Sequence, residues 1–583
     1  MSEVRSYKAQ QLIERMQVKV NRQIMLSLAS CVHCGMCTDQ CHYVLANPGD
    51  PTYAPAYKAD RIRKLFKAHI DWTGKAFPWW VGAKSVYTDA ELEDLKDTVF
   101  GKCTNCRRCS LNCPMGVDLA TFNRMARGLL VHVGVMPAGV SHVAKDQWEL
   151  GNQMGVLPEE YIDILSWMEE ELQSEYNDPT IKIPVDKPDA DVIYTINPRE
   201  AKYDPRTIAE AAAIFHFAGE NWTMSTDGWD MTNFGLFNGD DDLGGAVSSR
   251  LYDAAKTLNA KKIVISECGH GYRSTRCEGP NWAKRTVGTP MESSIFTMLD
   301  YIKSGRIKVD KTKNSEPVTY HDSCNLARSC GVTEEPRELL NLVCSDFREM
   351  TPNRAENFCC TGGGGAMSMT EYAPRRLASA KIKADQLRAT GAKIVLTSCH
   401  NCVDGLFDLI KHYKLDMEVK LLVNMVANAL VVPARVASEP VVAAPGKALA
   451  GRKILVVDDE PDVRTYLRMI FRDEGAQVIE APDANQAMRL LKSDRPDLMT
   501  LDLIMPHKTG ERMYWELRKD PDFSTLPIVI VTGYARVDAP AIDFHKFIAE
   551  KNLAEPDGFL EKPIQPETVL DTVIKVLAKK TAN

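Results

Sequence analysis

The chain has 583 residues and a formal net charge of −7, with 44% hydrophobic and 26% charged residues. This composition is ordinary for a globular protein and excludes a disordered chain, and the length corresponds to roughly three to five domains. The acidic balance argues against a nucleic-acid-binding protein, which usually carries a basic domain or stripe. We interpret the short basic cluster at residues 61–67 as a solvated helix face, with docking of an acidic partner as the alternative.

Membrane and export signals are missing from the sequence pattern. The first 20 residues contain no apolar segment of the kind found in a signal peptide. No run of about 18 uncharged apolar residues occurs, so we expect no direct membrane span. The chain is therefore predicted to be cytoplasmic, and a peripheral position on the inner face of the membrane would require partner subunits.

Composition and hydrophobic periodicity divide the chain into segments. The first begins with an expected amphipathic helix over residues 1–30 and holds two cysteine clusters. The five predicted segments are a helical two-cluster domain at 1–135, a helical connector at 136–190, an α/β region at 191–430, an Ala/Val/Pro linker at 431–451 and a compact βα domain at 452–583.

Two four-cysteine runs stand out in the first segment. The run Cys31-x-x-Cys34-x-x-Cys37-x-x-x-Cys41 is followed by Cys103-x-x-Cys106-x-x-Cys109-x-x-x-Cys113-Pro114. In two-cluster ferredoxins, three thiolates at this spacing bind one cubane 4Fe–4S cluster and the fourth cysteine ligates the other. We therefore predict two cubanes, with these ligand sets: Cys31, Cys34, Cys37 and Cys113 for one, and Cys103, Cys106, Cys109 and Cys41 for the other.

A structural zinc site is the alternative for these cysteines, but such a site usually pairs two Cys-x-x-Cys units. Two complete four-cysteine runs make this alternative the weaker one. His42 stands where proline follows the last cysteine of the second run, which removes no ligand. The insert from Trp72 to Trp80 is interpreted as a contact surface for a membrane subunit rather than a local core.

The 191–430 region contains an internal repeat. Residues 192–198 (VIYTINP) match 318–324 (VTYHDSC), residues 232–239 (TNFGLFNG) match 356–363 (ENFCCTGG), and residues 261–271 match 392–402. The order and spacing of the three blocks agree between the copies. We infer a duplicated α/β unit whose two copies differ at the positions that would hold a ligand.

The second copy carries five cysteines at these positions. If each lies at the carboxyl end of a strand, where open α/β sheets place their ligands, all five converge. Residues 362–365 are glycines, which leave the backbone free to approach a cluster. Five soft thiolates suit iron and sulfide, whereas zinc needs only four ligands. The five are Cys324, Cys359, Cys360, Cys399 and Cys402.

The twin four-cysteine runs followed by this duplicated unit resemble the heterodisulfide reductase family, over residues 1 to about 430. The resemblance is closest to its D-type catalytic subunit and to the DsrK-type subunit of sulfur metabolism. It implies that the five cysteines bind a noncubane 4Fe–4S cluster, which splits a disulfide in two one-electron steps. The implied fold is multidomain α/β, with an α-helical ferredoxin-like domain, a duplicated cysteine-rich CCG unit and a doubly wound (βα)5 receiver.

The same resemblance implies partners and a reaction. Electrons would come from a haem b membrane subunit, and the substrate would be a disulfide or trisulfide on a small DsrC-like carrier protein. The expected activity is that of a disulfide or trisulfide reductase within a membrane-associated respiratory complex. The direction of electron flow in the cell does not follow from the sequence.

The first copy departs from the family pattern. Pro198 stands at the position of Cys324, and of the cysteines only Cys268 remains, so we expect no cluster in this half. By pseudo-symmetry Cys268 should face the cluster of the other half. We hypothesise that His270 gives a proton to the leaving thiolate, with a buried structural histidine as the alternative, and that Arg273 or Arg276 binds a carboxylate of the partner. Other cysteines are interpreted as packing residues: Cys277, Cys330 and Cys344.

The last segment carries acidic residues at predicted strand ends. Asp458 and Asp459 follow the strand at 453–457, and Asp502 follows the strand at 498–501. Three carboxylates suit Mg²⁺, and the hydroxyl of Thr532 and the amine of Lys562 suit a phosphoryl group.

Residues 452–583 resemble two-component receivers. This resemblance implies that Asp502 accepts phosphate, that Asp458, Asp459 and Asp502 hold Mg²⁺, that Thr532 and Lys562 sense the phosphate, and that Phe559 is the aromatic switch. A histidine kinase would be the partner. A domain that only docks partners is the alternative.

Two other functions stay open for the whole chain. One is an electron-relay iron–sulfur subunit of a flavin dehydrogenase, similar to that of glycolate oxidase. The other is a phosphorelay protein whose clusters sense redox state. A strict requirement for a flavoprotein would favour the first, and phosphorylation that leaves electron flow unchanged would favour the second.

Overall fold

The computed structural model describes residues 7–432, 447–503, 505, 509–533, 548, 551, 553–562 and 564–581. The chain divides into two compact units on either side of the bond between residues 433 and 434. Most of the predicted linker at 431–451 lies outside the described residues. Among the described helices, none combines the length and the apolar character that crossing a membrane requires.

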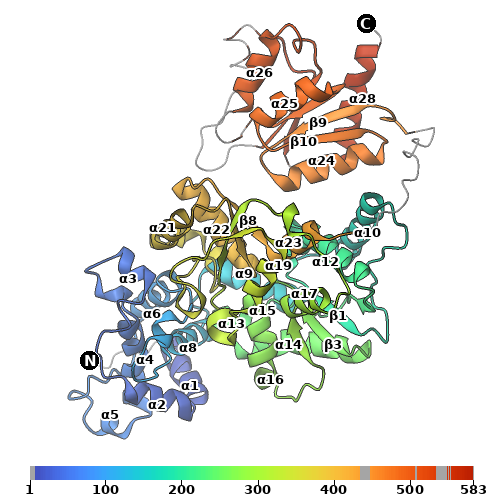
Figure 1. The fold of residues 1–583 in the computed structure, drawn as a ribbon. Coiled ribbons are helices and arrows are strands. Elements are labelled where there is room, and N and C mark those ends of the chain that lie inside the picture. Colours follow the sequence, from blue (N-terminus) through green and yellow to red (C-terminus); the bar gives the residue numbers. More distant parts are fainter. Residues whose placement is uncertain are drawn as a thin grey trace. The chain divides into compact units, whose positions relative to one another are not determined.

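The first part of the larger unit is helical (Figure 1). The expectation of a single helix over residues 1–30 is wrong, because the first helix ends at Lys19. A second helix begins at Arg22, and the side chain of Asn21 caps it by accepting a hydrogen bond from the Ile24 amide. The helices are α1 (Tyr7–Lys19), α2 (Arg22–Ser30), α3 (His42–Ala46), η1 (Pro51–Tyr53), α4 (Pro55–His69), α5 (Trp72–Ala76), α6 (Asp89–Lys96), η2 (Asp97–Gly101), α7 (Arg108–Leu111), α8 (Leu119–His132), α9 (Ala138–Leu150) and α10 (Pro158–Tyr176).

A four-stranded parallel sheet follows, in the order β2-β1-β3-β4. Its central strands are buried on both faces, which explains their continuous apolar sequences. The elements are β1 (Val192–Thr195), α11 (Pro198–Tyr203), α12 (Arg206–Phe217), β2 (Trp222–Thr223), α13 (Phe234–Asn238), α14 (Asp241–Thr257), β3 (Lys262–Ile265), α15 (Gly269–Tyr272), η3 (Arg273–Glu278), α16 (Gly279–Trp282), β4 (Met291–Ser293), α17 (Ser294–Lys303) and η4 (Lys311–Lys313).

A second parallel sheet has the order β6-β5-β7-β8, so its strands succeed one another as those of the first sheet do. The two sheets meet at their carboxyl ends, where the backbones at Cys268 and Cys399 pair in an isolated antiparallel β-bridge. The elements are β5 (Pro317–His321), α18 (Ala327–Cys330), α19 (Glu335–Val343), β6 (Asp346–Phe347), η5 (Arg354–Glu356), η6 (Ala366–Ser368), η7 (Thr370–Tyr372), α20 (Ala373–Ser379), α21 (Lys381–Thr390), β7 (Ile394–Thr397), α22 (His400–Tyr413), β8 (Glu418–Leu421) and α23 (Leu422–Ala429).

The smaller unit is a five-stranded parallel sheet in the order β10-β9-β11-β12-β13. Two hydrophobic cores, one containing Leu455 and Met499 and the other containing Ile454 and Val529, bury neighbouring residues of the same strands. This doubly wound parallel arrangement is the one predicted. The elements are β9 (Lys453–Val457), α24 (Pro461–Asp473), β10 (Gln477–Ala481), α25 (Ala484–Asp494), β11 (Leu498–Leu501), α26 (Gly510–Lys519), β12 (Ile528–Gly533), β13 (Gly558–Lys562) and α28 (Pro566–Thr581).

One buried guanidinium joins the helical part to both sheet regions. Arg127 on α8 is fully buried and donates to the carbonyl oxygens of Val99 (2.9 Å), Cys103 (2.5 Å), Phe237 (2.8 Å) and Gly364 (2.6 Å). Burial lowers its pKa to about 10, so the side chain is still charged at neutral pH. Its contacts hold α8 against the predicted ligand Cys103, helix α13 and the glycine-rich loop at 362–365.

We predict that Arg127→Leu lowers the free energy of unfolding of the larger unit by roughly 3 kcal/mol or more. The substitution leaves several buried carbonyl groups without a donor, each costing about 1–3 kcal/mol. Chemical denaturation of the whole chain measures this loss, with the transition of the smaller unit as an internal reference. Arg285→Leu is the matched control, because its partner Asp253 is exposed and surface ion pairs contribute about 1 kcal/mol or less. Equal losses in the two variants would contradict the role assigned to Arg127.

Candidate iron–sulfur and phosphoacceptor sites

The two four-cysteine runs adopt the same unusual backbone. His33 and Asn105, each just before the second cysteine of its run, both have φ near 55°. Gly35 and Arg107, each just after that cysteine, also have positive φ values of 81° and 65°. Left-handed conformations are uncommon for residues other than glycine, so their recurrence at matching positions indicates two loops built for the same purpose.

The fourth cysteine of the first run lies with the second run. Burial and then the nearby thiols of Cys106 and Cys103 raise the pKa of Cys41, apart from an opposing effect of Lys58. Cys109 shares these neighbours, and its pKa is raised by burial and then by Cys106, Cys41 and Cys103. Cys41 therefore lies with three cysteines of the second run, the grouping that the predicted ligand set requires.

The other group is more open. Cys31 lies close enough to Cys37 to contribute to raising its pKa, after the larger effect of burial. Cys31 and Cys113 both pack against the hydrophobic core that includes Cys37. Cys34 is exposed, so the ligand set that contains it lies nearer the surface than the set that contains Cys41.

The five cysteines of the second α/β copy form a continuous series of thiols. Cys359 interacts with Cys324 and Cys360, Cys360 interacts with Cys402, and Cys402 interacts with Cys399. Four of the five are buried and Cys324 is partly exposed. All five therefore come together, with Cys324 at the accessible end. The expectation that each follows a strand is wrong for the pair Cys359 and Cys360, which lie in the loop after η5.

The thiol series touches the second four-cysteine run. The thiols of Cys106 and Cys359 interact directly, and the Thr104 hydroxyl lies 3.4 Å from the Cys359 sulfur. Gly364 makes this approach possible. It has a φ of 66°, and a Cβ there would lie 2.4 Å from the Thr104 carbonyl oxygen. The glycines at 362–365 thus include positions for close backbone packing, rather than serving only to clear space for a ligand.

Cys268 and His270 of the first copy face the same series, as the pseudo-symmetry predicts. The Cys268 sulfur lies 3.0 Å from Nδ1 of His270, and ligand atoms of Cys268, His270 and Cys399 all lie within 4.8 Å of one another. Both Cys268 and His270 are buried. The ring of His270 lies against that of Phe237, with 4.5 Å between centroids.

A buried polar network behind the cysteines escaped the sequence reasoning. Asn357 donates from Nδ2 to Nδ1 of His321 at 3.1 Å and accepts a hydrogen bond from the fully buried Lys383. This arrangement leaves Nε2 of His321 to face Cys360 as a donor, and the imidazole lowers the Cys360 pKa after the larger effect of Cys359. Burial lowers the Lys383 pKa to about 7. The position of His321 at the end of a strand could have marked it as a candidate site residue. No sequence pattern marked Lys383 in this way.

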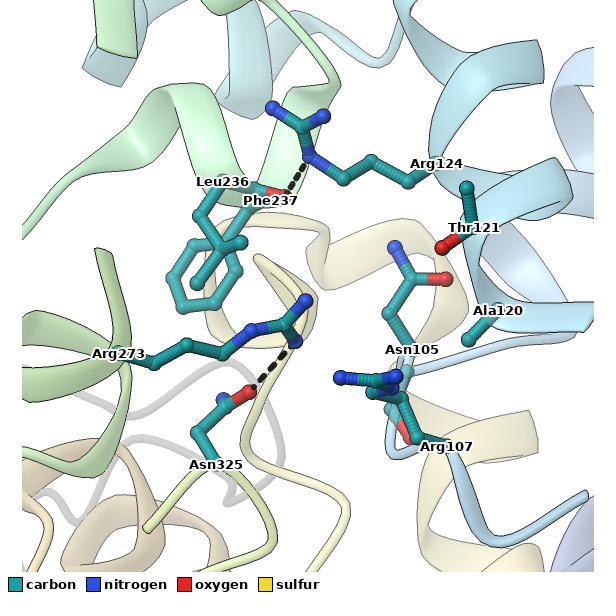
Figure 2. Close-up of a pocket in the computed structure, with 10 residues that line it drawn as sticks. Asn105, Arg107, Ala120, Thr121, Arg124, Leu236, Phe237, Arg273 and Asn325 are labelled. Carbon is teal, nitrogen blue, oxygen red and sulfur yellow. Dashed lines mark hydrogen bonds between the residues drawn. The ribbon is translucent and has the colours of Figure 1, made fainter. Parts of the chain in front are cut away.

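A pocket lies near the thiol series (Figure 2), and its lining includes Thr104, which contacts Cys359, and Asn325, which follows Cys324. Its walls come from both parts of the larger unit, with Asn105 and Arg107 facing Phe237, Arg273 and Asn325. Asn325 follows the partly exposed Cys324, and its Oδ1 accepts from Arg273 at 3.1 Å. Arg273 therefore lies in the pocket, whereas Arg276 is exposed and stacks on Tyr272.

The donor set fits an iron–sulfur group. Burial raises the pKa of thiols such as Cys41 and Cys109, which makes uncompensated thiolates costly in this region. Binding to iron offsets that cost, because metal ligation stabilises the deprotonated thiol. So many thiols gathered in one place suit iron and sulfide better than an oxygen-seeking cation.

The interpretation of Cys277 and Cys330 as packing residues is wrong, because neither side chain is buried. Cys277 is exposed and Cys330 is partly exposed, and their sulfurs lie 3.6 Å apart. Cys344 is buried as expected of a packing residue.

In the smaller unit, carboxylates gather at the ends of β9 and β11. Ligand atoms of Asp458, Asp459, Glu460 and Asp502 lie within 4.8 Å of one another. Burial raises the pKa of Asp458 to about 7, against the effect of Lys562, whose amine lies 2.8 Å from Asp458 and 2.9 Å from Asp502. The sequence reasoning did not count Glu460 among these acidic groups.

The two sensing positions lie on the neighbouring strands. Thr532 is on β12 and Lys562 is on β13, where Thr532 pairs with Glu561 and Gly533 pairs with Lys562 in the parallel register. Phe559, the predicted aromatic switch, is 37% exposed. The arrangement joins a cation-binding acidic group to a hydroxyl and an amine, which suits a transferred phosphoryl group.

Comparisons with known protein families match three parts of the chain. A 4Fe-4S dicluster domain matches residues 27–117, a cysteine-rich domain called CCG matches residues 318–406, and a response regulator receiver domain matches residues 454–574. The matched ranges contain the two cysteine runs, the thiol series and the acidic cluster in turn.

Relatives span most of the larger unit. The Hdr-like menaquinol oxidoreductase iron-sulfur subunit 2 of Archaeoglobus fulgidus is 28% identical over 461 residues, which cover 71% of this chain and 81% of that protein. The D-type subunit of the dihydromethanophenazine:CoB–CoM heterodisulfide reductase of Methanosarcina mazei is 27% identical over 412 residues, covering 70% and 95%. EtfAB:quinone oxidoreductase of Syntrophomonas wolfei is 24% identical over 439 residues, covering 68% and 57%.

The domain matches and the relatives agree with the geometry of the cysteines and carboxylates. The chain is an iron–sulfur oxidoreductase similar to subunits of the heterodisulfide reductase family, and it carries a response regulator receiver domain.

Proposed function

We propose that this chain passes electrons through two cubane 4Fe–4S clusters to a noncubane 4Fe–4S centre that reduces a disulfide or trisulfide on a small carrier protein. The observation that supports the proposal best is the direct interaction between Cys106 and Cys359. It joins a predicted cubane ligand to the thiol series, so an electron would have only a short distance to cross.

The proposed ligands follow the sequence prediction. Cys31, Cys34, Cys37 and Cys113 would hold one cubane, and Cys41, Cys103, Cys106 and Cys109 the other. The noncubane centre would be held by Cys324, Cys359, Cys360, Cys399 and Cys402. When bound, this centre supplies the single electrons that open the sulfur–sulfur bond. The two α/β sheets would be two copies of one CCG unit, of which only the second kept its ligands.

The protein's own side chains would bind and protonate the substrate. The pocket of Figure 2 is lined by Asn325, the residue after Cys324, which is the accessible end of the series. Arg107, Arg124 and Arg273 line it, so an acidic segment of the carrier would be favoured there. His270, close to Cys268 and Cys399, would give a proton to the leaving thiolate.

Partners would bring the chain to the membrane. Trp72, Trp79 and Trp80 are 73%, 82% and 73% exposed, which supports the interpretation of this insert as a contact surface rather than a local core. We propose that it binds a haem b membrane subunit on the inner face of the membrane, as in DsrK-type complexes. A DsrC-like protein would be the carrier.

A relay role is the second candidate, supported by the likeness to EtfAB:quinone oxidoreductase. In that role the chain would pass electrons between a flavoprotein and quinone, and the thiol series would not meet a sulfur substrate. The two candidates differ in whether the isolated holoprotein reduces a trisulfide without a flavoprotein.

The test uses the anaerobic holoprotein, reduced methyl viologen as donor and a trisulfide-bearing DsrC-like carrier, with released thiols as the readout. We expect turnover by the unmodified chain. Cys359→Ser should lose turnover by roughly a hundred-fold or more, because a ligand of the reactive centre is lost. His270→Gln should keep its iron yet turn over about a hundred-fold more slowly, as for loss of a general acid.

Cys344→Ala is the matched control, because Cys344 is buried but takes no part in the thiol series, and it should retain turnover. Turnover by Cys359→Ser equal to that of the control would exclude the reductase function. Full turnover and full iron in His270→Gln would make His270 a buried structural histidine. Turnover that appears only on adding a flavoprotein would support the relay instead.

For the receiver, we propose that Asp502 accepts a phosphoryl group from a histidine kinase, that Asp458, Asp459 and Asp502 hold Mg²⁺, and that Thr532 and Lys562 respond to the phosphate. Acetyl phosphate with Mg²⁺ should give an acid-labile phosphoryl group on the unmodified chain. Asp502→Asn should abolish it, whereas Asp522→Asn, a change at an exposed aspartate, should not. Equal labelling of both variants would place the phosphoacceptor elsewhere, and removal of Mg²⁺ should abolish labelling in every variant that retains Asp502.

A further inference from the structure

Cys277 and Cys330 belong to none of the proposed cluster ligand sets. Their sulfurs lie 3.6 Å apart, and both are accessible to solvent, Cys277 more than Cys330. Structural packing thiols are usually buried, as Cys344 is in this chain. Two accessible thiols held this close are arranged for reaction with each other.

The electrostatic surroundings distinguish the two thiols. The interaction with Cys330 is the largest cause lowering the Cys277 pKa to about 7, and Arg276 and Arg273 lower it further. The interaction with Cys277 raises the pKa of Cys330. A thiol with a pKa near neutrality is partly ionised and is the better nucleophile. Cys277 thus has the properties of an attacking thiol and Cys330 those of a resolving thiol.

The pair lies between segments of the two α/β copies. Cys277 is on η3, which continues directly from α15 and its His270, and Cys330 ends α18, which follows Cys324. Arg273 of η3 also donates to Asn325, and both residues line the pocket (Figure 2). A covalent link between the two sulfurs would therefore hold the two segments that bound one side of the pocket.

We infer that Cys277 and Cys330 form a redox-active dithiol that exchanges with disulfides and, when oxidised, links the segment of His270 to the segment of Cys324. The Cys277 thiolate attacks one sulfur of a small disulfide and forms a mixed disulfide, while the first small thiol leaves and takes up a proton. The Cys330 thiol then loses its proton, attacks the Cys277 sulfur and releases the second small thiol. Two protein thiols are oxidised by two electrons, and one disulfide is reduced to two thiols.

The test equilibrates the anaerobic holoprotein with defined ratios of reduced and oxidised glutathione. Free thiols are then blocked, protein disulfides are reduced and labelled with a second reagent, and the peptides are identified by mass spectrometry. We expect Cys277 and Cys330 to become protected together, in one two-electron transition, within a single chain. Cys344 should remain a free thiol throughout and serves as the control. This readout does not depend on turnover, so it can succeed or fail separately from the reductase proposal.

Single variants test the order of attack. In Cys330→Ser, Cys277 should accumulate as a stable mixed disulfide with glutathione, because the resolving thiol is missing. In Cys277→Ser, Cys330 should react more slowly than Cys277 does in Cys330→Ser, because Cys330 is less exposed than Cys277 and burial raises its pKa even without Cys277. Independent oxidation of the two cysteines, a link between two chains, or equal reactivity of the two single variants would each overturn the inference.

Hydrogen exchange tests the structural consequence. Oxidation of the unmodified chain should slow amide exchange in residues 269–278 and 327–331, because opening of either segment would require the other to follow. Cys277→Ser should show no such change under the same conditions. Unchanged exchange in an unmodified chain whose disulfide has formed would also overturn the proposed link between the segments.

Discussion

The arrangement of the larger unit depends on the buried guanidinium of Arg127. A charged side chain without access to water is tolerated only where acceptors surround it, and Arg127 finds them in the carbonyls of Val99, Cys103, Phe237 and Gly364. These acceptors come from three distant parts of the sequence. Satisfying one cation therefore fixes a four-cysteine loop against both α/β copies, and the thiols of Cys106 and Cys359 meet as a consequence.

Around this junction the cysteines of the thiol series differ in their exposure to solvent. Cys359, Cys360, Cys399 and Cys402 are buried, whereas Cys324 is partly exposed and its neighbour Asn325 lines the pocket. The buried network of Lys383, Asn357 and His321 supports Cys360 from behind. The proposed proton donor His270 and the proposed electron source, the second four-cysteine run, both lie next to the thiol series, as the proposed cleavage of a sulfur–sulfur bond would need.

The sequence predicted the residues whose chemistry depends on local spacing. The four-cysteine runs, the strand-end carboxylates and the repeated blocks of the α/β region are all local patterns, and the exchange of Cys41 into the second run follows from known cluster geometry. The alternation of strands and helices in the α/β region and the doubly wound character of the last segment also followed from the sequence pattern, whereas the strand orders became visible only in the structure.

Features made by contacts between distant segments were beyond the sequence. Lys383 lies on a helix, and nothing in the local sequence pattern shows that its side chain is buried. Its hydrogen bond to Asn357 is therefore visible only in the structure. Cys277 and Cys330 looked like packing cysteines because nothing in the sequence brings them together. The boundary between α1 and α2 was missed because the helical spacing of apolar residues continues across it. The extended backbone of Asn21, which caps α2, ends the helical conformation there.

The proposed function requires that the thiol series hold a third, reactive iron–sulfur centre. The iron and sulfide content of the anaerobically purified chain, together with an EPR spectrum recorded after oxidation in the presence of thiols, tests this requirement. We expect about twelve irons per chain and a paramagnetic signal from the thiol-treated oxidised centre. About eight irons without that signal would contradict this expectation, because the thiol series would then hold no such centre.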